Sequence, residues 1–93
     1  MIKFSYETQE EVELEAAIDE SFVLMLYNDD VNTFDHVIES LVEICGHDTV
    51  QAEQVAFLVH TKGKCDIKHG KFETLEKMCY KLLKRQLSAV IEQ

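Results

Sequence analysis

The sequence predicts a single α+β domain, a two-layer sandwich in which three helices cover a small three-stranded antiparallel sheet. The chain has 93 residues, too few to divide into two separate cores. Apolar residues make up 46% of it, and three glycines with no proline are typical of a folded domain and not of a linker. The hydrophobic pattern also alternates between strand-like runs and helical spacing, in the order β-α-α-β-α-β.

The first 20 residues differ in composition from the rest, and we expect them to form an acidic, flexible N-terminal arm before a domain at residues 21–93. They hold seven acidic side chains and one basic side chain. They lack the basic start and the apolar core of a secretory signal. No apolar run in the chain approaches the roughly 20 residues of a membrane span. We therefore expect a cytoplasmic protein without a membrane partner.

The first strand is expected at residues 22–27, where apolar side chains follow one another without a break. Such a run suits a strand that is buried on both faces or lies at the centre of a small sheet. A helix is expected at residues 34–45, because apolar residues recur there at spacings of three and four. Asn32 or Thr33 would cap its start, and Gly46 would end it. The apolar face of this helix consists of Phe34, Val37, Ile38, Leu41, Val42 and Cys45.

A second helix is expected to start at Asp48 or Thr49 and to end over residues 60–63. Asp48 and Gln51 are three residues apart, as in a capping box. A stripe of apolar residues follows at helical spacing, so this helix should also bury one face. The stripe consists of Ala52, Val55, Ala56 and Val59.

The last third of the chain is expected to hold a strand, a helix and a closing strand. The strand covers residues 64–68 and is followed by a turn at residues 69–70. The helix begins near residue 72 and runs to about residue 85, and the closing strand covers residues 87–91. The buried face of this helix consists of Leu75, Met78, Cys79, Leu82 and Leu83.

Charge is distributed unevenly along the chain, whose net charge is −9. Residues 1–60 hold one base and fourteen acids, net −13, whereas residues 61–93 hold eight bases and four acids, net +4. Such a surface repels phosphate backbones over most of its area, so no nucleic-acid partner is expected. Cationic groups, including an ammonium ion, are the natural partners of the acidic part.

The cysteines suggest free thiols first and a zinc site second. Cys45, Cys65 and Cys79 are an odd set in a chain without an export signal, which favours reduced thiols. Cys45 and Cys65 with His47 and His69 nevertheless form a nominal Cys2His2 set for zinc. Their spacings, Cys-x-His and Cys-x3-His, do not match the common finger patterns, and Cys45 falls on the apolar face of a predicted helix. We expect no metal and no other cofactor, with zinc binding as the alternative.

Catalysis has little support in the sequence. No Ser or Cys stands in a nucleophile-like turn, no glycine-rich phosphate loop is present, and so short a chain offers little wall for a pocket that excludes water. Asp29 or Asp30 could act with His60 in hydrolysis, but nothing else in the chain points to that chemistry. We expect a protein that is not an enzyme.

Asn28, Asp29 and Asp30 stand where the first strand gives way to the first helix. Asn and Asp are favoured in turns because their side chains bind nearby backbone N–H groups, so a turn is the simplest interpretation. Two adjacent carboxylates repel each other, however, unless a cation or several donors balance them. His60, at the end of the second helix, is by itself more typical of a structural histidine or a helix-end cation. An Asn oxygen, a carboxylate and a neutral imidazole would together supply the three acceptors that an R–NH3+ group requires.

With these residues in view, the sequence resembles the ClpS family, the adaptors that deliver proteins to Clp-type AAA+ unfoldase–protease machines. The NDD at residues 28–30, followed by FDHVI at residues 34–38, resembles the NDD motif of that family and the helix after it. The segment from AEQ to VH at residues 52–60, followed by GK at residues 63–64, resembles its second signature. The resemblance covers about residues 22–92, with the motifs in the same order.

The resemblance implies a protein that binds N-degrons, meaning the free α-amino group and bulky apolar first side chain of substrates that begin with Leu, Phe, Tyr or Trp. Asn28 and His60 would bind the α-ammonium, with Asp29 and Asp30 adding negative potential and direct or water-mediated contacts. The implied partner of this monomeric adaptor is the N-terminal domain of a ClpA-like or ClpC-like unfoldase, which residues 1–20 would engage. The implied side-chain pocket is lined by Asn32, Phe34, Val37, Ala56 and Val59, with Leu26 and Leu87 at its base.

Two stretches of the implied pocket depart from the family pattern. Asn32-Thr33-Phe34 stands where the family commonly has Thr-Pro-Met, and Ala56 stands where it often has Met. One change adds a ring and the other removes most of a long side chain, so the pocket would keep its volume and change its shape. We expect a changed ranking among Leu, Phe, Tyr and Trp, with some tolerance of β-branched first residues. The alternative is a Clp-docking modulator that no longer reads N-degrons and acts as an inhibitor or selector.

Overall fold

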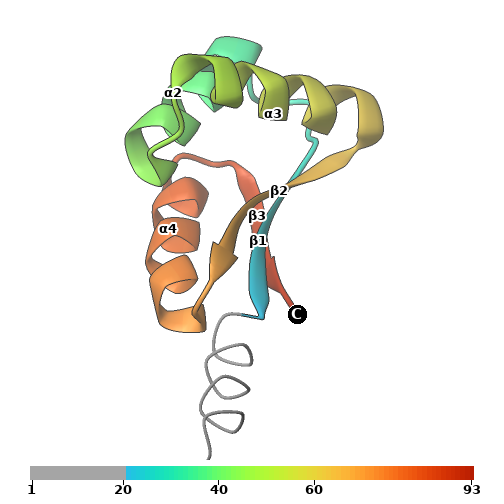
Figure 1. Ribbon diagram of the computed structural model, residues 1–93. Coiled ribbons are helices and arrows are strands. Elements are labelled where there is room, and N and C mark those ends of the chain that lie inside the picture. Colours follow the sequence, from blue (N-terminus) through green and yellow to red (C-terminus); the bar gives the residue numbers. More distant parts are fainter. Residues whose placement is uncertain (1–20) are drawn as a thin grey trace, which may run out of the picture.

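The computed structural model describes residues 21–93 and confirms the predicted order of strands and helices (Figure 1). The expected arm at residues 1–20, and with it the division of the chain into arm and domain, lies outside the described residues. No helix within residues 21–93 is long and apolar enough to cross a membrane. The elements are β1 (Phe22–Tyr27), α2 (Phe34–Cys45), α3 (Thr49–Lys62), β2 (Lys64–Gly70), α4 (Phe72–Lys84) and β3 (Ser88–Glu92).

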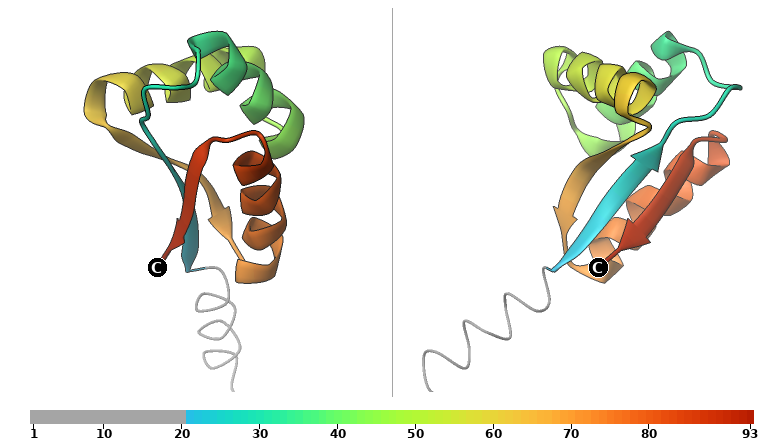
Figure 2. Two further views of the ribbon diagram at one scale, coloured as in Figure 1. Left: turned by 180° about the vertical axis from the view of Figure 1, so that it is seen from behind. Right: turned by 90° about the vertical axis from the view of Figure 1, so that its right-hand side faces the viewer.

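The three strands form one antiparallel sheet in the order β2-β1-β3, so β1 is the central strand. Helix α4 lies along one face of this sheet, and no described element covers the other face (Figure 2). Leu24 and Leu26 are buried, whereas Val23 and Met25 are only half-buried. Of the two environments expected for this strand, the central position is confirmed. Burial on both faces is wrong, because helices cover the sheet from one side only.

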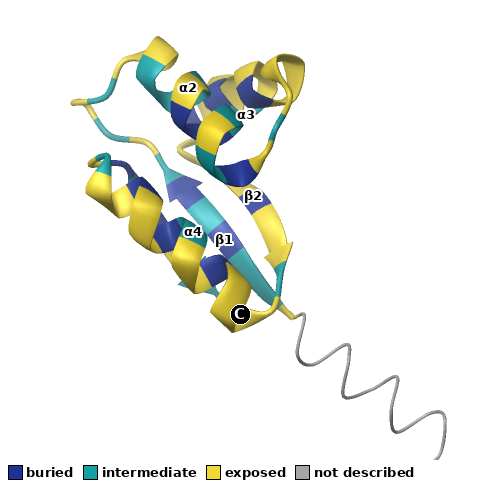
Figure 3. Cartoon of the chain, turned by 90° about the vertical axis from the view of Figure 1, so that its left-hand side faces the viewer, coloured by how far each residue is buried: buried dark blue, intermediate teal, exposed yellow. Residues whose placement is uncertain are grey.

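Helices α2 and α3 pack against each other at one end of the sheet, beyond the end of β1 (Figure 1). Buried positions of β1, α3 and α4 form a continuous interior, while the outward positions of α4 are exposed (Figure 3). This arrangement brings the loop between β1 and α2, residues 28–33, to the junction between the helix pair and the sheet. The fully buried large side chains are Leu24, Leu26, Leu41, Leu75 and Leu82.

The ends of α2 and α3 are fixed by the residues expected to cap them. Of the two candidates for the start of α2, Thr33 is the cap, since its Oγ1 accepts a hydrogen bond from the His36 N–H at 3.1 Å. Gly46 ends this helix with a φ of 74°. Asp48 and Gln51 form the predicted capping box at the start of α3.

Three details in the last third of the chain differ from the prediction. Strand β2 continues to Gly70 because its last two residues pair with the start of β1, so the predicted turn at residues 69–70 is wrong. Leu83 is 50% exposed, because it follows the buried Leu82 by about 100° around the helix axis. Strand β3 begins one residue later than expected, at Ser88.

Replacing Leu82 by alanine should lower the free energy of unfolding by about 2–5 kcal/mol, because it removes a fully buried side chain and leaves a cavity. The neighbouring Leu83→Ala variant is a matched control and should cost less than about 1 kcal/mol, since half of that side chain is already exposed. Urea denaturation followed by circular dichroism measures both changes. Equal losses for the two variants would contradict the assignment of Leu82, and not Leu83, to the core.

Candidate functional site

The candidate site is built around residues 28–33, the loop that joins β1 to α2. The backbone N–H of Asn28 donates to the carbonyl of Gly63 at 2.9 Å, one residue beyond the last pair of the β1–β2 ladder. Gly63 ends α3 with a φ of 93°, a left-handed conformation that favours glycine. The end of β1 is therefore fastened to the end of α3, where His60 lies.

Asp29 holds this loop in shape. Its Oδ1 accepts hydrogen bonds from the backbone N–H groups of Val31 and Asn32, both at 2.9 Å. Its Oδ2 accepts from Asn32 Nδ2 at 2.8 Å and from the Ser88 hydroxyl at 3.4 Å. Burial alone would raise the pKa of the Asp29 carboxyl, but the hydrogen bonds from Asn32, Val31 and Ser88 outweigh burial and hold the pKa below its ordinary value of 3.8. Asp29 is therefore ionised at neutral pH, with both oxygens engaged by the loop and the start of β3.

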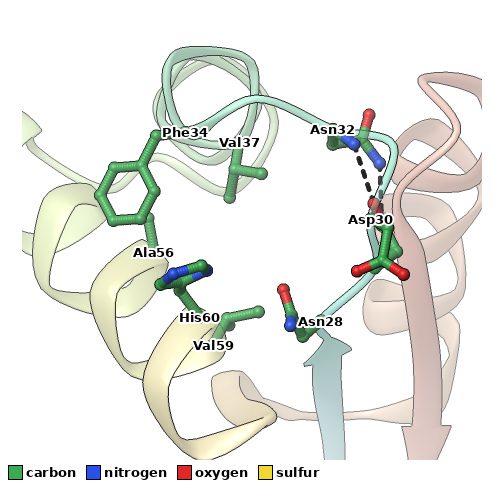
Figure 4. A pocket seen from close by; sticks show the side chains of 9 residues that line it. Asn28, Asp30, Asn32, Phe34, Val37, Ala56, Val59 and His60 are labelled. Atoms are coloured by element: carbon green, nitrogen blue, oxygen red, sulfur yellow. Dashed lines mark hydrogen bonds between the residues drawn. The ribbon is translucent and has the colours of Figure 1, made fainter.

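Asn28, Asp30 and His60 stand around the opening of a pocket (Figure 4). Asn28 and Asp30 come from the loop, directly after the end of β1, and His60 comes from the last turn of α3. All three residues are exposed, and the described part of the chain provides no hydrogen-bond partner for their side chains. An amide oxygen, a carboxylate and an imidazole nitrogen are thus available to a ligand at one opening.

The walls of the pocket are apolar and come from α2 and α3 (Figure 4). The pocket has a volume of about 270 Å³, just below the roughly 300–1,000 Å³ of typical small-molecule sites. A hollow of about 20 Å³, room for about one water molecule, lies deeper between the same two helices and the sheet. The apolar lining consists of Phe34, Val37, Ala56 and Val59, with Leu26 and Leu87 around the smaller hollow.

Phe34 lies at the mouth of the pocket, although the sequence pattern also counts it in the apolar face of α2. Its side chain is 43% exposed, and its ring extends from α2 toward Ala56 (Figure 4). The ring meets the imidazole of His60 edge to face, with centroids 6.1 Å apart and planes at 84°. The short Ala56 side chain leaves the space beside α3 that this ring occupies.

The structure brings the eleven residues of the predicted site to this one place, while their roles stay predictions. Sequence reasoning missed two residues behind the loop. The Ser88 hydroxyl donates to Asp29, and the Gln86 carbonyl accepts from Asn32 Nδ2 at 2.8 Å. No signal in the sequence identifies them, because both bonds depend on a turn more than 50 residues further along the chain lying against the loop.

The residues of the alternative zinc site do not form a metal centre. Cys45, His47 and His69 border a shallow hollow, but Cys65 does not. Within residues 21–93, no three His, Cys, Asp or Glu side chains lie close enough together to hold a metal ion. All three cysteines are free, and burial raises the pKa of Cys45 to about 11. Metal binding requires the thiolate, and the burial of Cys45 disfavours that charged form.

The chain resembles known proteins in sequence and in fold. A family model described as "ATP-dependent Clp protease adaptor protein ClpS" matches residues 17–89. The solved structure of Agrobacterium tumefaciens ClpS2 bound to L-phenylalaninamide resembles the chain with a TM-score of 0.73 and 18% sequence identity. The similarity covers 80% of this chain and 96% of that one, and at this identity it shows a common fold. A search of curated proteins found no match.

Replacing Asp29 by asparagine should lower the free energy of unfolding at neutral pH by about 1–2 kcal/mol, because an amide cannot accept all four hydrogen bonds. The folded carboxyl has a lowered pKa, so its contribution is complete above the unfolded value of about 4 and is lost as the pH falls through the folded value. The difference between wild type and variant should therefore shrink below pH 4. Chemical denaturation at several pH values measures it.

The exposed neighbour Asp30 provides the control for this experiment. Its carboxylate accepts no hydrogen bond from the described residues, so Asp30→Asn should leave the stability within about 0.5 kcal/mol of wild type. A stability difference for Asp29→Asn that stays constant down to the lowest pH at which the domain folds would contradict the role of the Asp29 carboxylate.

Proposed function

The chain belongs to the ClpS family of ATP-dependent Clp protease adaptors, and from this membership and the geometry of the pocket we propose that it binds the N-terminal residue of substrate proteins and delivers them to a Clp-type unfoldase. The bound group is an N-degron, a free α-amino group next to a bulky apolar first side chain. The protein acts by binding and performs no catalytic step.

Three acceptors around the opening, which have no hydrogen-bond partner among residues 21–93, are the observation that carries this proposal. A protonated α-amino group has three N–H donors, and Asn28, Asp30 and His60 offer one acceptor each. Hydrogen bonds to a charged group are about twice as strong as neutral ones. Among residues 21–93, no Lys or Arg lines the pocket, and the ionised Asp29 is part of its lining, so the local potential favours a cation.

The apolar lining supports a preference for a large apolar first side chain. A volume of about 270 Å³ suits one amino-acid side chain with its ammonium group better than an extended cofactor. Agrobacterium ClpS2 was solved with L-phenylalaninamide, which combines a free α-amino group with a single benzyl side chain. The proposed ligands of this chain have the same chemistry, namely proteins that begin with Leu, Phe, Tyr or Trp.

Phe34 and Ala56 set the order of preference among these residues in our proposal. The Phe34 ring narrows the mouth from the side of α2, and the small Ala56 side chain widens it from the side of α3. The Phe34 ring fills space on one side of the opening, and the Ala56 methyl group leaves space on the other side. The volume of the opening is thereby kept while its shape changes. We expect the ranking of Leu, Phe, Tyr and Trp to follow from this shape, with some tolerance of β-branched residues.

The proposed partner for delivery is the N-terminal domain of a Clp-type AAA+ unfoldase, either ClpA-like or ClpC-like. Membership in the adaptor family supports the class of partner. We place the protein in the cytoplasm as a monomer, and we assign contact with the unfoldase to the acidic residues 1–20.

A second candidate function is a Clp-docking modulator without N-degron binding. The exposed Phe34 ring at the mouth favours it, because a ring at this position narrows the way into the pocket.

A series of labelled peptides that differ only in the first residue tests the proposed function by fluorescence anisotropy. Peptides that begin with Leu, Phe, Tyr or Trp should bind, and a peptide that begins with Gly should bind at least tenfold more weakly, because it leaves the apolar walls uncovered. Acetylation of the α-amino group should abolish binding, since it removes the charge and two of the donors. Equal, weak binding of the Leu and Gly peptides would exclude N-degron recognition and favour the docking modulator.

Replacing His60 by alanine should weaken binding of the Phe peptide about 10- to 100-fold, because it removes one acceptor of a charge-assisted hydrogen bond and the ring that Phe34 contacts. His69→Ala is the matched control, since His69 is also exposed but lines a different hollow. The same anisotropy titration measures both variants. Equal affinity of the two variants for the Phe peptide would show that His60 is not part of the binding site.

A further inference from the structure

Two neighbouring carbonyl groups in the turn between α4 and β3 accept hydrogen bonds from side chains on the other side of the site. The carbonyl of Arg85 lies 2.9 Å from Nε2 of His36, in the first turn of α2. The carbonyl of Gln86 accepts from Nδ2 of Asn32 at 2.8 Å. Because a carbonyl oxygen can only accept, His36 donates through Nε2. Side chains of the loop and of the start of α2 are therefore both hydrogen-bonded to the segment that joins α4 to β3.

That turn has a fixed shape of its own. The N–H of Gln86 donates to the Leu83 carbonyl at 2.9 Å, and the N–H of Leu87 donates to the Leu82 carbonyl at 3.1 Å. Gln86 has a φ of 69°, which a residue with a side chain rarely adopts unless its surroundings hold it there. The two carbonyl acceptors thus belong to a firmly bonded turn and not to a loose end of α4.

A second set of contacts ties the same turn to the middle of α2. The guanidinium of Arg85 pairs with Glu43 and donates to the Ser40 hydroxyl at 3.5 Å. Ser40 is fully buried, and its hydroxyl donates in turn to the carbonyl of His36 at 2.8 Å. Contacts along two turns of α2 therefore hold this helix against the end of α4.

Asn32 connects these contacts to the predicted ammonium site. Its Nδ2 group donates to Asp29 as well as to Gln86, so one amide group bridges the loop and the turn. Asp29 lies between Asn28 and Asp30 in the chain, and its carboxylate fixes the backbone that carries both. The distance between these acceptors and His60 on α3 consequently depends on where the turn holds the loop.

We propose that Asn32 and His36 are positioning residues, which hold Asn28, Asp30 and Phe34 in place around the opening by clamping the loop and α2 to the carbonyls of Arg85 and Gln86. This proposal rests on the proposed function of the pocket. Neither carbonyl lines the pocket, so the turn acts through the residues that it holds. A Thr at position 32 could not replace Asn32 fully, because a hydroxyl group has one hydrogen to donate and the amide has two.

The test compares two clamp variants with variants that keep the bonding or break it elsewhere. Asn32→Ala removes the side-chain bonds to Gln86 and to Asp29, and His36→Phe removes the bond to Arg85. His36→Gln is the rescue variant, since a glutamine amide can donate from about the position of Nε2. Gln51→Ala is the matched control, because it removes a hydrogen bond in the capping box of α3 without touching the pocket. Affinity for the Phe peptide is measured by anisotropy, and hydrogen exchange at the Val31 and Asn32 amides is measured by NMR. Thermal melting confirms that each variant is folded.

We expect Asn32→Ala and His36→Phe to bind the Phe peptide roughly 3- to 10-fold more weakly and to exchange the two loop amides faster. His36→Gln should restore both properties, and Gln51→Ala should change neither. Wild-type affinity and wild-type exchange in both clamp variants would overturn the proposal. If the wild-type protein bound no peptide at all, the proposed function would fail separately, and the exchange data would still decide whether the clamp fixes the loop.

Discussion

The hydrogen bond from the Asn28 N–H to the Gly63 carbonyl is the contact on which the site depends. It extends the β1–β2 ladder by one residue and so joins the end of β1 to the residue that terminates α3. Gly63 can accept this bond because its left-handed backbone turns the chain from α3 directly into β2. Asn28 and His60 are therefore neighbours in space although 31 residues separate them in the sequence. The same geometry brings the NDD segment and the VH…GK segment together at one pocket.

The two adjacent aspartates have different surroundings, and this resolves the question of how two neighbouring carboxylates are tolerated. Asp29 accepts four hydrogen bonds within the protein, which stabilise its charge and define the path of the loop. Asp30 is exposed at the opening, where water or a cationic ligand can balance its charge. The same three residues thus form the turn and contribute to the proposed ammonium site, and the bonds of Asp29 leave Asp30 free to face the opening.

The sequence was sufficient for the order of the elements and for the caps of α2 and α3, because these depend on local pattern. The residues of the predicted site come from two motifs, and the structure places them around one pocket while their roles stay predictions. It was insufficient wherever packing between distant segments decides the outcome. Leu83 fits the helical spacing as well as Leu82 does, and only the position of α4 on the sheet leaves it exposed. Residues 69–70 resemble a turn, but pairing with β1 extends the strand through them. The bonds from Asn32 and His36 to the turn after α4 likewise have no local signal, since any backbone carbonyl can accept them.

Phe34 links the two parts of the proposed ligand. Its ring forms part of the apolar mouth of the pocket and also contacts the imidazole of His60, which belongs to the proposed ammonium site. A first side chain that pushes the ring aside must therefore disturb His60, whereas one that packs against the ring leaves His60 in place. In the proposed function, the preference for a first side chain is therefore coupled to the affinity for the α-amino group. Under this proposal, the shape made by Phe34 and Ala56 would influence how tightly a substrate is held as well as which substrate enters.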